Sequence, residues 1–241
     1  MHQNRLRASS FGSQAESYDA HRPRYPDAMI DDLLAGGARS ILDVGAGTGI
    51  ASRQFVERGA TVLAVEPDAR MAAVAQRAGV DVEVDTFEQW APNGRVFDAV
   101  VFAASFHWVD PAVALPKIRG LLRGGGHLAL LWNRLAPSGT TSEDLKGIYA
   151  GYWDVGTVDP HGHLTDLIRT LTAGGYDVEA RSYPQTRHYT RQGWIDFAFT
   201  HSNYLTLNAD QAATLRAELA ERIGDGVTVV GDALAIHATP R

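Results

Sequence analysis

The sequence of 241 residues contains no cysteine. Disulfide frameworks and thiolate metal sites are therefore excluded, and the absence fits a cytoplasmic protein. No apolar run approaches the roughly eighteen residues of a membrane span. The polar segment 1–10 lacks the apolar core of a signal peptide. We therefore expect a cytoplasmic protein with no membrane partner.

Basic residues are outnumbered, since 22 Lys and Arg oppose 28 Asp and Glu and give a formal net charge of −6. Nucleic-acid-binding proteins normally carry a basic patch that meets the phosphates. Lysine and arginine are scattered in this sequence, so no nucleic-acid partner is expected. No histidine pair has convincing zinc-ligand spacing, and no metal site is predicted. The oligomeric state is left open.

Short apolar runs alternate with helical stretches in the first half of the chain. The predicted strands cover 39–44, 61–65, 80–84, 97–103 and 127–132, and the predicted helices cover 27–34, 50–58, 69–78 and 111–122. Strands that alternate with helices across short glycine turns indicate βαβ units and a parallel, doubly wound sheet. Beyond 133 we expect helices at 162–173 and 209–223 and strands at 177–189 and 227–238.

The first strand leads directly into a glycine loop, 43–49, with the sequence DVGAGTG. Glycines let a backbone approach a ligand closely, and this position in a doubly wound sheet is where ligands bind. The dinucleotide fingerprint is G-x-G-x-x-G, whereas this loop has G-x-G-x-G after Asp43. A carboxylate would repel a pyrophosphate but attract the sulfonium and ammonium groups of S-adenosylmethionine. The loop therefore favours S-adenosylmethionine over a dinucleotide.

Glu66 ends the second predicted strand. A carboxylate at this place can accept hydrogen bonds from both hydroxyl groups of a ribose. It would serve a dinucleotide or S-adenosylmethionine equally, so Glu66 indicates a nucleoside without deciding which.

Four segments resemble the class I S-adenosylmethionine-dependent methyltransferase family in order and spacing. They are ILDVGAGTG at 41–49, VLAVEPD at 62–68, FDAVVFAASFHWVD at 97–110 and LLRGGGHLAL at 121–130. The resemblance, which covers about 11–133 well, implies an α/β fold: a Rossmann-like, doubly wound, mostly parallel sheet with a final antiparallel strand and a helical cap. It also implies S-adenosylmethionine as cofactor, held by Asp43, Gly45, Ala46, Gly47, Gly49, Glu66, Pro67, Thr86, Phe87 and Ala103.

The stretch after the fourth predicted strand holds the candidate catalytic residues, His107 and Trp108. Its Phe/His/Trp arrangement resembles the small-molecule branch that includes trans-aconitate and juvenile hormone acid methyltransferases. Trp108 could wall the site, and His107 could orient the acceptor or take its proton. Tyr18 and Arg22 lie in a segment that, by the same resemblance, closes over the cofactor, and Arg22 could pair with the cofactor's carboxylate.

We expect one domain, 1–241, with a cofactor-binding core at 11–133 and cap insertions at 134–160 and 189–226. The cap is expected to select the acceptor, and its candidate pocket residues are Tyr149, Tyr152, Trp153, His188, Trp194, Phe197, His201 and Tyr204. The predicted reaction is methyl transfer to an oxygen atom of a small-molecule acceptor, with a carboxylate as one candidate. The alternatives are carbon methylation of the quinone type, an NAD(P)-dependent oxidoreductase, and a module that binds S-adenosylmethionine without turnover.

Overall fold

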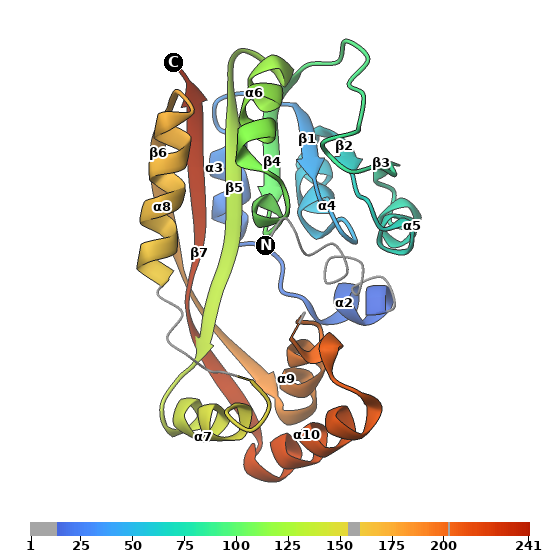
Figure 1. The fold of residues 1–241 in the computed structure, drawn as a ribbon, viewed down its shortest axis with the longest axis vertical. Coiled ribbons are helices and arrows are strands. Elements are labelled where there is room, and N and C mark those ends of the chain that lie inside the picture. The colour runs from blue at the N-terminus through green and yellow to red at the C-terminus, as the bar shows by residue number, and fades with distance from the viewer. Residues whose placement is uncertain (1–13, 154–159, 202) are drawn as a thin grey trace.

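A twisted sheet forms the centre of the computed structural model, which describes residues 14–153, 160–201 and 203–241 (Figure 1). Within these residues the sheet has seven strands in the order β3-β2-β1-β4-β5-β7-β6. The strands are β1 (Ser40–Val44), β2 (Thr61–Val65), β3 (Asp81–Glu83), β4 (Phe97–Ala103), β5 (Leu122–Pro137), β6 (Tyr176–Thr190) and β7 (Gly226–Pro240). Only β7 runs against its neighbours, β5 and β6. The predicted doubly wound, mostly parallel sheet with a final antiparallel strand is confirmed.

Helices cover both faces of the sheet (Figure 1). They are α2 (Ala15–His21), α3 (Asp27–Leu34), α4 (Ile50–Val56), α5 (Ala69–Arg77), α6 (Pro111–Leu121), α7 (Thr140–Tyr149), α8 (Pro160–Ala173), α9 (Arg191–Ala198) and α10 (Ala209–Arg222), with short 3-10 turns η2 (Phe106–Trp108) and η3 (Tyr204–Thr206). Side chains alternate across β4, so that Phe102 packs in one core with Ile118 of α6, whereas Val101 packs in the other with Phe55 of α4. The two layers bury β4 on both faces.

Two strand-to-helix junctions have clear sequence causes. The carboxylate of Asp68 accepts a hydrogen bond from the Arg70 amide and caps α5. Asp110 caps α6 in the same way through Ala112, with Pro111 in the first turn. Both patterns satisfy backbone donors that a helix start leaves unpaired. They fix where the chain turns back after β2 and β4, beside the carboxyl ends of these strands.

The last three strands are longer than predicted. Antiparallel pairing between β5 and β7 continues from Leu128↔Ala238 to Pro137↔Val229, well past the predicted end of the strand at residue 132. The reason is the partner strand, which supplies hydrogen bonds to a segment whose own sequence has little apolar periodicity. The extension carries β5, β6 and β7 beyond the rest of the sheet (Figure 1).

Helices α7, α9 and α10 pack against this extension and form what we call the cap helices (Figure 1). Trp194 and Phe197 of α9 share a buried cluster with Leu215 and Leu219 of α10 and with Leu145 of α7. The sequence predicted α10, but not α7 or α9, nor the seven-residue α2. No helix in the described part of the chain is long and apolar enough to cross a membrane.

Candidate active site

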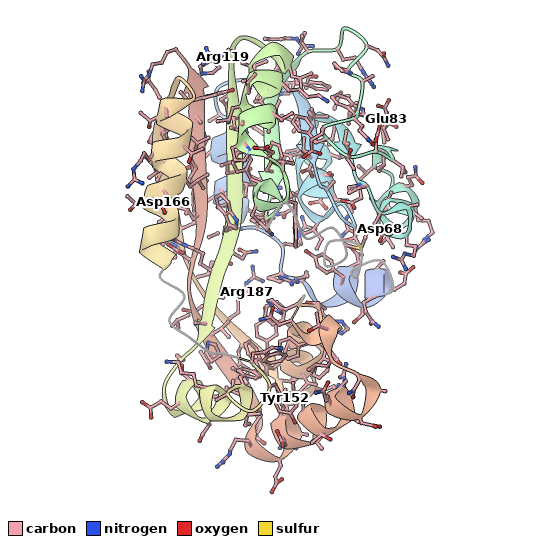
Figure 2. All side chains as sticks on the ribbon, in the orientation of Figure 1. Asp68, Glu83, Arg119, Tyr152, Asp166 and Arg187 are labelled. Atoms are coloured by element: carbon pink, nitrogen blue, oxygen red, sulfur yellow. The ribbon has the colours of Figure 1, made fainter. Side chains whose placement is uncertain are left out.

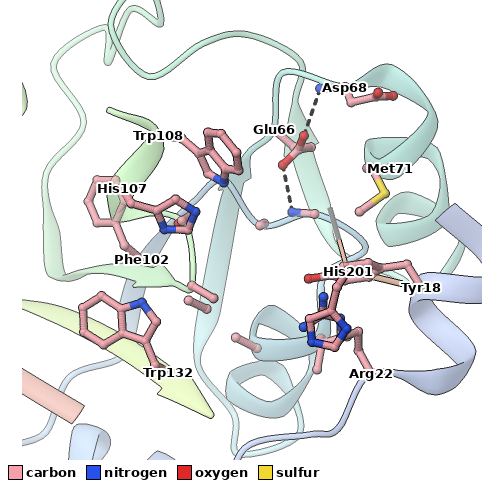
Figure 3. Close-up of a pocket in the computed structure, with 18 of the residues that line it drawn as sticks. Tyr18, Arg22, Glu66, Asp68, Met71, Phe102, His107, Trp108, Trp132 and His201 are labelled. Atoms are coloured by element: carbon pink, nitrogen blue, oxygen red, sulfur yellow. Dashed lines mark hydrogen bonds between the residues drawn. The ribbon is translucent and has the colours of Figure 1, made fainter. Parts of the chain in front are cut away.

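A cavity of about 1010 Å³ opens between the sheet and the cap helices. Val44, Val65 and Ala103, the last residues of β1, β2 and β4, line it. Ligand pockets usually measure about 300–1,000 Å³, so this cavity has room for two molecules side by side. Figure 3 shows that its two ends differ: Glu66 and Met71 lie on one side, and His107 and Trp132 on the other.

The glycine loop forms the floor of the cavity. Gly45 and Gly47 line it with φ angles of +65° and +59°, a left-handed conformation that side chains disfavour. Gly45 also lies against β4, because a Cβ atom on it would be 2.6 Å from the Cβ of Ser105. The Ser105 hydroxyl donates to the carbonyl of Val44. Ser105, which the sequence analysis missed, therefore holds the loop against the end of β4.

Replacing Gly45 by alanine is expected to lower the free energy of unfolding by about 2–4 kcal/mol, because the left-handed backbone and the contact with Ser105 both oppose a side chain. Gly59 is a matched control: its φ is +80°, but no atom lies within 4 Å of a Cβ placed there. Gly59→Ala should cost only about 1–2 kcal/mol. Urea unfolding followed by circular dichroism measures both. Equal losses would show that Ser105 does not restrict the loop.

Glu66 is the buried carboxylate of the cavity, with 7% of its surface exposed. Its two oxygens accept hydrogen bonds from the backbone amides of Gly47 at 2.8 Å and Asp68 at 2.9 Å (Figure 3). Burial raises the pKa of Glu66 to about 7. These amides fix the carboxylate where the end of β2 meets the glycine loop, and each oxygen keeps a lone pair for a ligand hydroxyl.

Two predicted cofactor residues do not line the cavity. Asp43 is fully buried, and its Oδ2 accepts a hydrogen bond from the Ser52 hydroxyl at 2.6 Å. Burial raises the pKa of Asp43 to about 6. Gly49 lies against Ala75 of α5, where a Cβ would approach to 3.0 Å. The other oxygen of Asp43, Oδ1, has no hydrogen-bond partner in the described residues. The assignment of Asp43 and Gly49 to cofactor binding stays a prediction.

The other predicted cofactor residues line the cavity: Tyr18, Arg22, Ala46, Pro67, Thr86, Phe87 and Ala103. Glu88, which was not predicted, lines it as well. The segment of Thr86 to Glu88 is anchored from outside, because the ammonium of Lys117 on α6 donates to the carbonyls of Phe87 and Trp90. The wall of the cavity after β3 is thereby tied to α6.

His107 and Trp108 both line the cavity, as predicted, and their rings lie 4.6 Å apart (Figure 3). The imidazole of His107 lines the cavity, and neither of its nitrogens has a hydrogen bond to a residue that the structure describes. The surrounding protein lowers the pKa of His107 to about 4 through burial. At neutral pH the ring is uncharged and can accept a proton.

Helix α2 closes the cavity from one side. Its Asp19 pairs with Arg53 of α4 at 3.1 Å, and the next residue after the helix, Arg22, donates to the carbonyl of Thr200 at 3.1 Å. The guanidinium lies over the rings of Tyr18 and Phe197, and its Nε has no hydrogen-bond partner in the described residues. Arg22 therefore links α2 to α9 and keeps a donor for an anion.

The cap contributes only some of its predicted aromatic residues. Tyr149, Trp194, Phe197, His201 and Tyr204 line the cavity, whereas Tyr152, Trp153 and His188 do not. The hydroxyl of Tyr152 instead donates to Glu218 among the cap helices (Figure 2). Trp132, the last residue of the predicted strand, and Asn133, the first residue beyond it, line the cavity but were missed as site residues. In the described residues no group of three His, Asp or Glu side chains is placed to hold a metal ion.

Comparisons with known proteins show similarity to methyltransferases. A family model described as "Methyltransferase domain" matches residues 42–130. An uncharacterized methyltransferase of Mycobacterium tuberculosis is 43% identical over 222 residues, which cover 89% of this chain and 84% of the relative. An uncharacterized methyltransferase-like protein of Schizosaccharomyces pombe is 29% identical over 131 residues, covering 52% of this chain and 51% of that one.

Two solved structures share the fold. A candidate type II methyltransferase from Anaeromyxobacter dehalogenans has a TM-score of 0.68 and 23% identity, covering 91% of this chain and 99% of its own. A methyltransferase from Thiobacillus denitrificans, solved with S-adenosyl-L-homocysteine, has a TM-score of 0.51 and 16% identity, covering 92% and 94%. The trans-aconitate branch stays a prediction. The oxidoreductase alternative is wrong, because the chain belongs to the class I S-adenosylmethionine-dependent methyltransferases.

Proposed function

We propose that this methyltransferase transfers the methyl group of S-adenosylmethionine to an oxygen atom of a small molecule. The observation that carries the proposal is the position of the His107 imidazole, which lines the cavity between the glycine loop and the aromatic wall of the cap. Burial lowers the pKa of His107 to about 4, so the ring is neutral near pH 7. An imidazole in this state can accept the proton that a hydroxyl group loses on methylation. The cavity is large enough to enclose both reactants in one space.

The residues on one side of the cavity fit the cofactor. Glu66 offers two carboxylate oxygens to the ribose hydroxyls, and the Gly45–Gly47 backbone leaves room for the methionine part. Thr86 and Phe87 would flank the adenine, with Ala46, Pro67 and Ala103 completing the wall. The unpartnered Nε of Arg22 suits the carboxylate of the methionine part. We assign these residues to cofactor binding.

The remaining residues would act on the acceptor. When bound, S-adenosylmethionine supplies an electrophilic methyl group on a positively charged sulfur. The walls of the cavity would hold the acceptor oxygen against this methyl group, which would pass from the sulfur to the oxygen. His107 takes the hydroxyl proton, and the rings of Trp108 and Trp132 exclude water from the reacting atoms. A carboxylate acceptor would need no base.

An acceptor screen with isotope-labelled methyl donor tests the proposal. Purified protein is incubated with S-adenosylmethionine, labelled in its methyl group, and a panel of phenols, alcohols, carboxylic acids and quinols. We expect label in a product whose methyl carbon has the NMR shift of an ether or ester. A carbon-bound methyl group would favour the quinone-type alternative. Tight binding of S-adenosylhomocysteine with no labelled product from any acceptor would favour a binding module.

A further inference from the structure

His201 is a cap residue that lies beside Arg22. It follows α9, lines the cavity and packs edge to face against Phe197, with 4.8 Å between the ring centroids. The guanidinium of Arg22 lies 5.6 Å from the centre of the same ring and donates to the carbonyl of Thr200, the residue before His201. Figure 3 shows the imidazole of His201 near Arg22 and away from His107. These contacts place His201 next to the residue assigned to the methionine part of the cofactor.

The protonation state of the His201 ring follows from its contacts. Its Nδ1 lies 3.1 Å from the carbonyl oxygen of Ala198. Because a carbonyl oxygen only accepts hydrogen bonds, Nδ1 carries the proton and Nε2 presents a lone pair. Burial lowers the pKa of His201 to about 3, and the positive charge of Arg22 acts in the same direction. The ring therefore stays neutral near pH 7, with Nε2 as a hydrogen-bond acceptor.

The Nε2 atom of His201 is available to a ligand. It makes no hydrogen bond to any residue in the described ranges, and it keeps accessible surface, in contrast to the enclosed Nε1 of Trp194 on α9. On Arg22, Nη2 donates to Thr200, whereas Nη1 has no hydrogen bond to a described residue and is accessible as well. A cationic donor and a neutral acceptor thus lie near each other at the wall of the cavity.

This pair fits the amino-acid end of S-adenosylmethionine, where a carboxylate and an ammonium group are attached to one carbon atom. The guanidinium attracts the carboxylate, and the ammonium then needs an acceptor nearby. The acidic residues that line the cavity in the described part of the chain, Glu66, Asp68 and Glu88, follow β2 and β3, where the ribose and adenine are assigned. A neutral imidazole nitrogen can accept from the ammonium without repelling the carboxylate beside it.

We propose that His201 accepts a hydrogen bond from the ammonium group of the cofactor's methionine part, while Arg22 pairs with the carboxylate of the same part. The inference goes beyond oxygen methylation, because it does not depend on which acceptor is methylated. It moves His201 from the predicted acceptor pocket to the cofactor site. The cap thereby takes part in cofactor binding as well as in the choice of acceptor.

Calorimetric titration with three ligands tests this inference without turnover. The ligands are S-adenosylhomocysteine, its deamino analogue, in which hydrogen replaces the amino group, and methylthioadenosine, which lacks the whole amino-acid end. The wild-type protein should bind S-adenosylhomocysteine at least about 10-fold tighter than the deamino analogue, the value of a hydrogen bond to a charged group. In His201→Phe, which keeps a ring against Phe197, this preference should shrink by about 10-fold, while binding of methylthioadenosine stays unchanged.

Two further variants and one measurement on the wild-type protein complete the test. His201→Gln should keep part of the preference, because its amide oxygen can take the place of Nε2. His188→Phe is the matched control, since His188 is exposed and does not line the cavity, and it should keep the full preference. In the wild-type protein the nitrogen NMR resonance of His201 Nε2 should shift with S-adenosylhomocysteine but not with the deamino analogue. An undiminished preference in His201→Phe, or an Nε2 resonance that responds equally to both ligands, would overturn the inference.

Discussion

Replacing Glu66 by alanine is expected to weaken the binding of S-adenosylhomocysteine by at least about 100-fold, because two hydrogen bonds from ribose hydroxyls to a buried carboxylate are lost. Calorimetric titration measures the change. Glu57→Ala is the control, since Glu57 is an exposed carboxylate that pairs with Arg24 outside the cavity. It should bind as the wild-type protein does. A loss below threefold in Glu66→Ala would remove Glu66 from the ribose site.

Glu66 should also make the binding of S-adenosylhomocysteine depend on pH. Burial raises the pKa of Glu66 to about 7, and only the ionised carboxylate can accept from both ribose hydroxyls. Binding should therefore release a proton and become about tenfold tighter from pH 6 to pH 8. Glu66→Gln should weaken binding and make it independent of pH. Wild-type binding that weakens as the pH rises would contradict the assignment.

Replacing His107 by glutamine is expected to lower kcat for a hydroxyl acceptor by about 100- to 10,000-fold, the range typical of a general base. The affinity for S-adenosylhomocysteine should change by less than about threefold, because the cofactor's assigned contacts lie elsewhere in the cavity. Since burial lowers the pKa of His107 to about 4, the imidazole stays neutral and wild-type kcat should not fall from pH 8 to pH 6 through this residue. Steady-state kinetics with an acceptor from the screen measures each value.

His188→Gln is the matched control for this experiment. His188 is exposed, bonds to Thr228 at 3.1 Å and does not line the cavity, so kcat should be unchanged. A second comparison uses acceptor acidity: the loss in His107→Gln should shrink for phenols that are already ionised. If His107→Gln has the same kcat as the wild-type protein with a poorly acidic phenol, His107 lines the site without acting as a base.

The sequence predicted the cofactor side of the site well because its signals are local. A strand that ends in a glycine loop places Gly45 and Gly47 at the sheet edge, and Glu66 follows the neighbouring strand at the same edge. The direction of the Asp43 side chain was not predictable in this way. It depends on the Ser52 hydroxyl one helical turn into α4, which draws the carboxylate behind the loop.

The acceptor side was harder to predict because its geometry is set by contacts far apart in the sequence. Asn133 lines the cavity because β5 continues beyond its apolar run, and β7 pairs it with Ala233. Its amide is then oriented by Gln185 on β6 at 2.9 Å. The ring of Trp153, by contrast, packs near Tyr204 without reaching the cavity. The residue types alone could not show that Asn133 reaches the cavity and that Trp153 does not.

A crystal structure with bound S-adenosylhomocysteine tests the central assignment most directly. The account predicts both ribose hydroxyls within hydrogen-bond distance of Glu66, the homocysteine part along Gly45–Gly47, and the sulfur facing the cap side of the cavity beside His107. It also predicts that the ligand leaves the space around Trp194 and Tyr149 open for an acceptor. A ligand whose ribose lies away from Glu66, or whose sulfur faces away from His107, would contradict it.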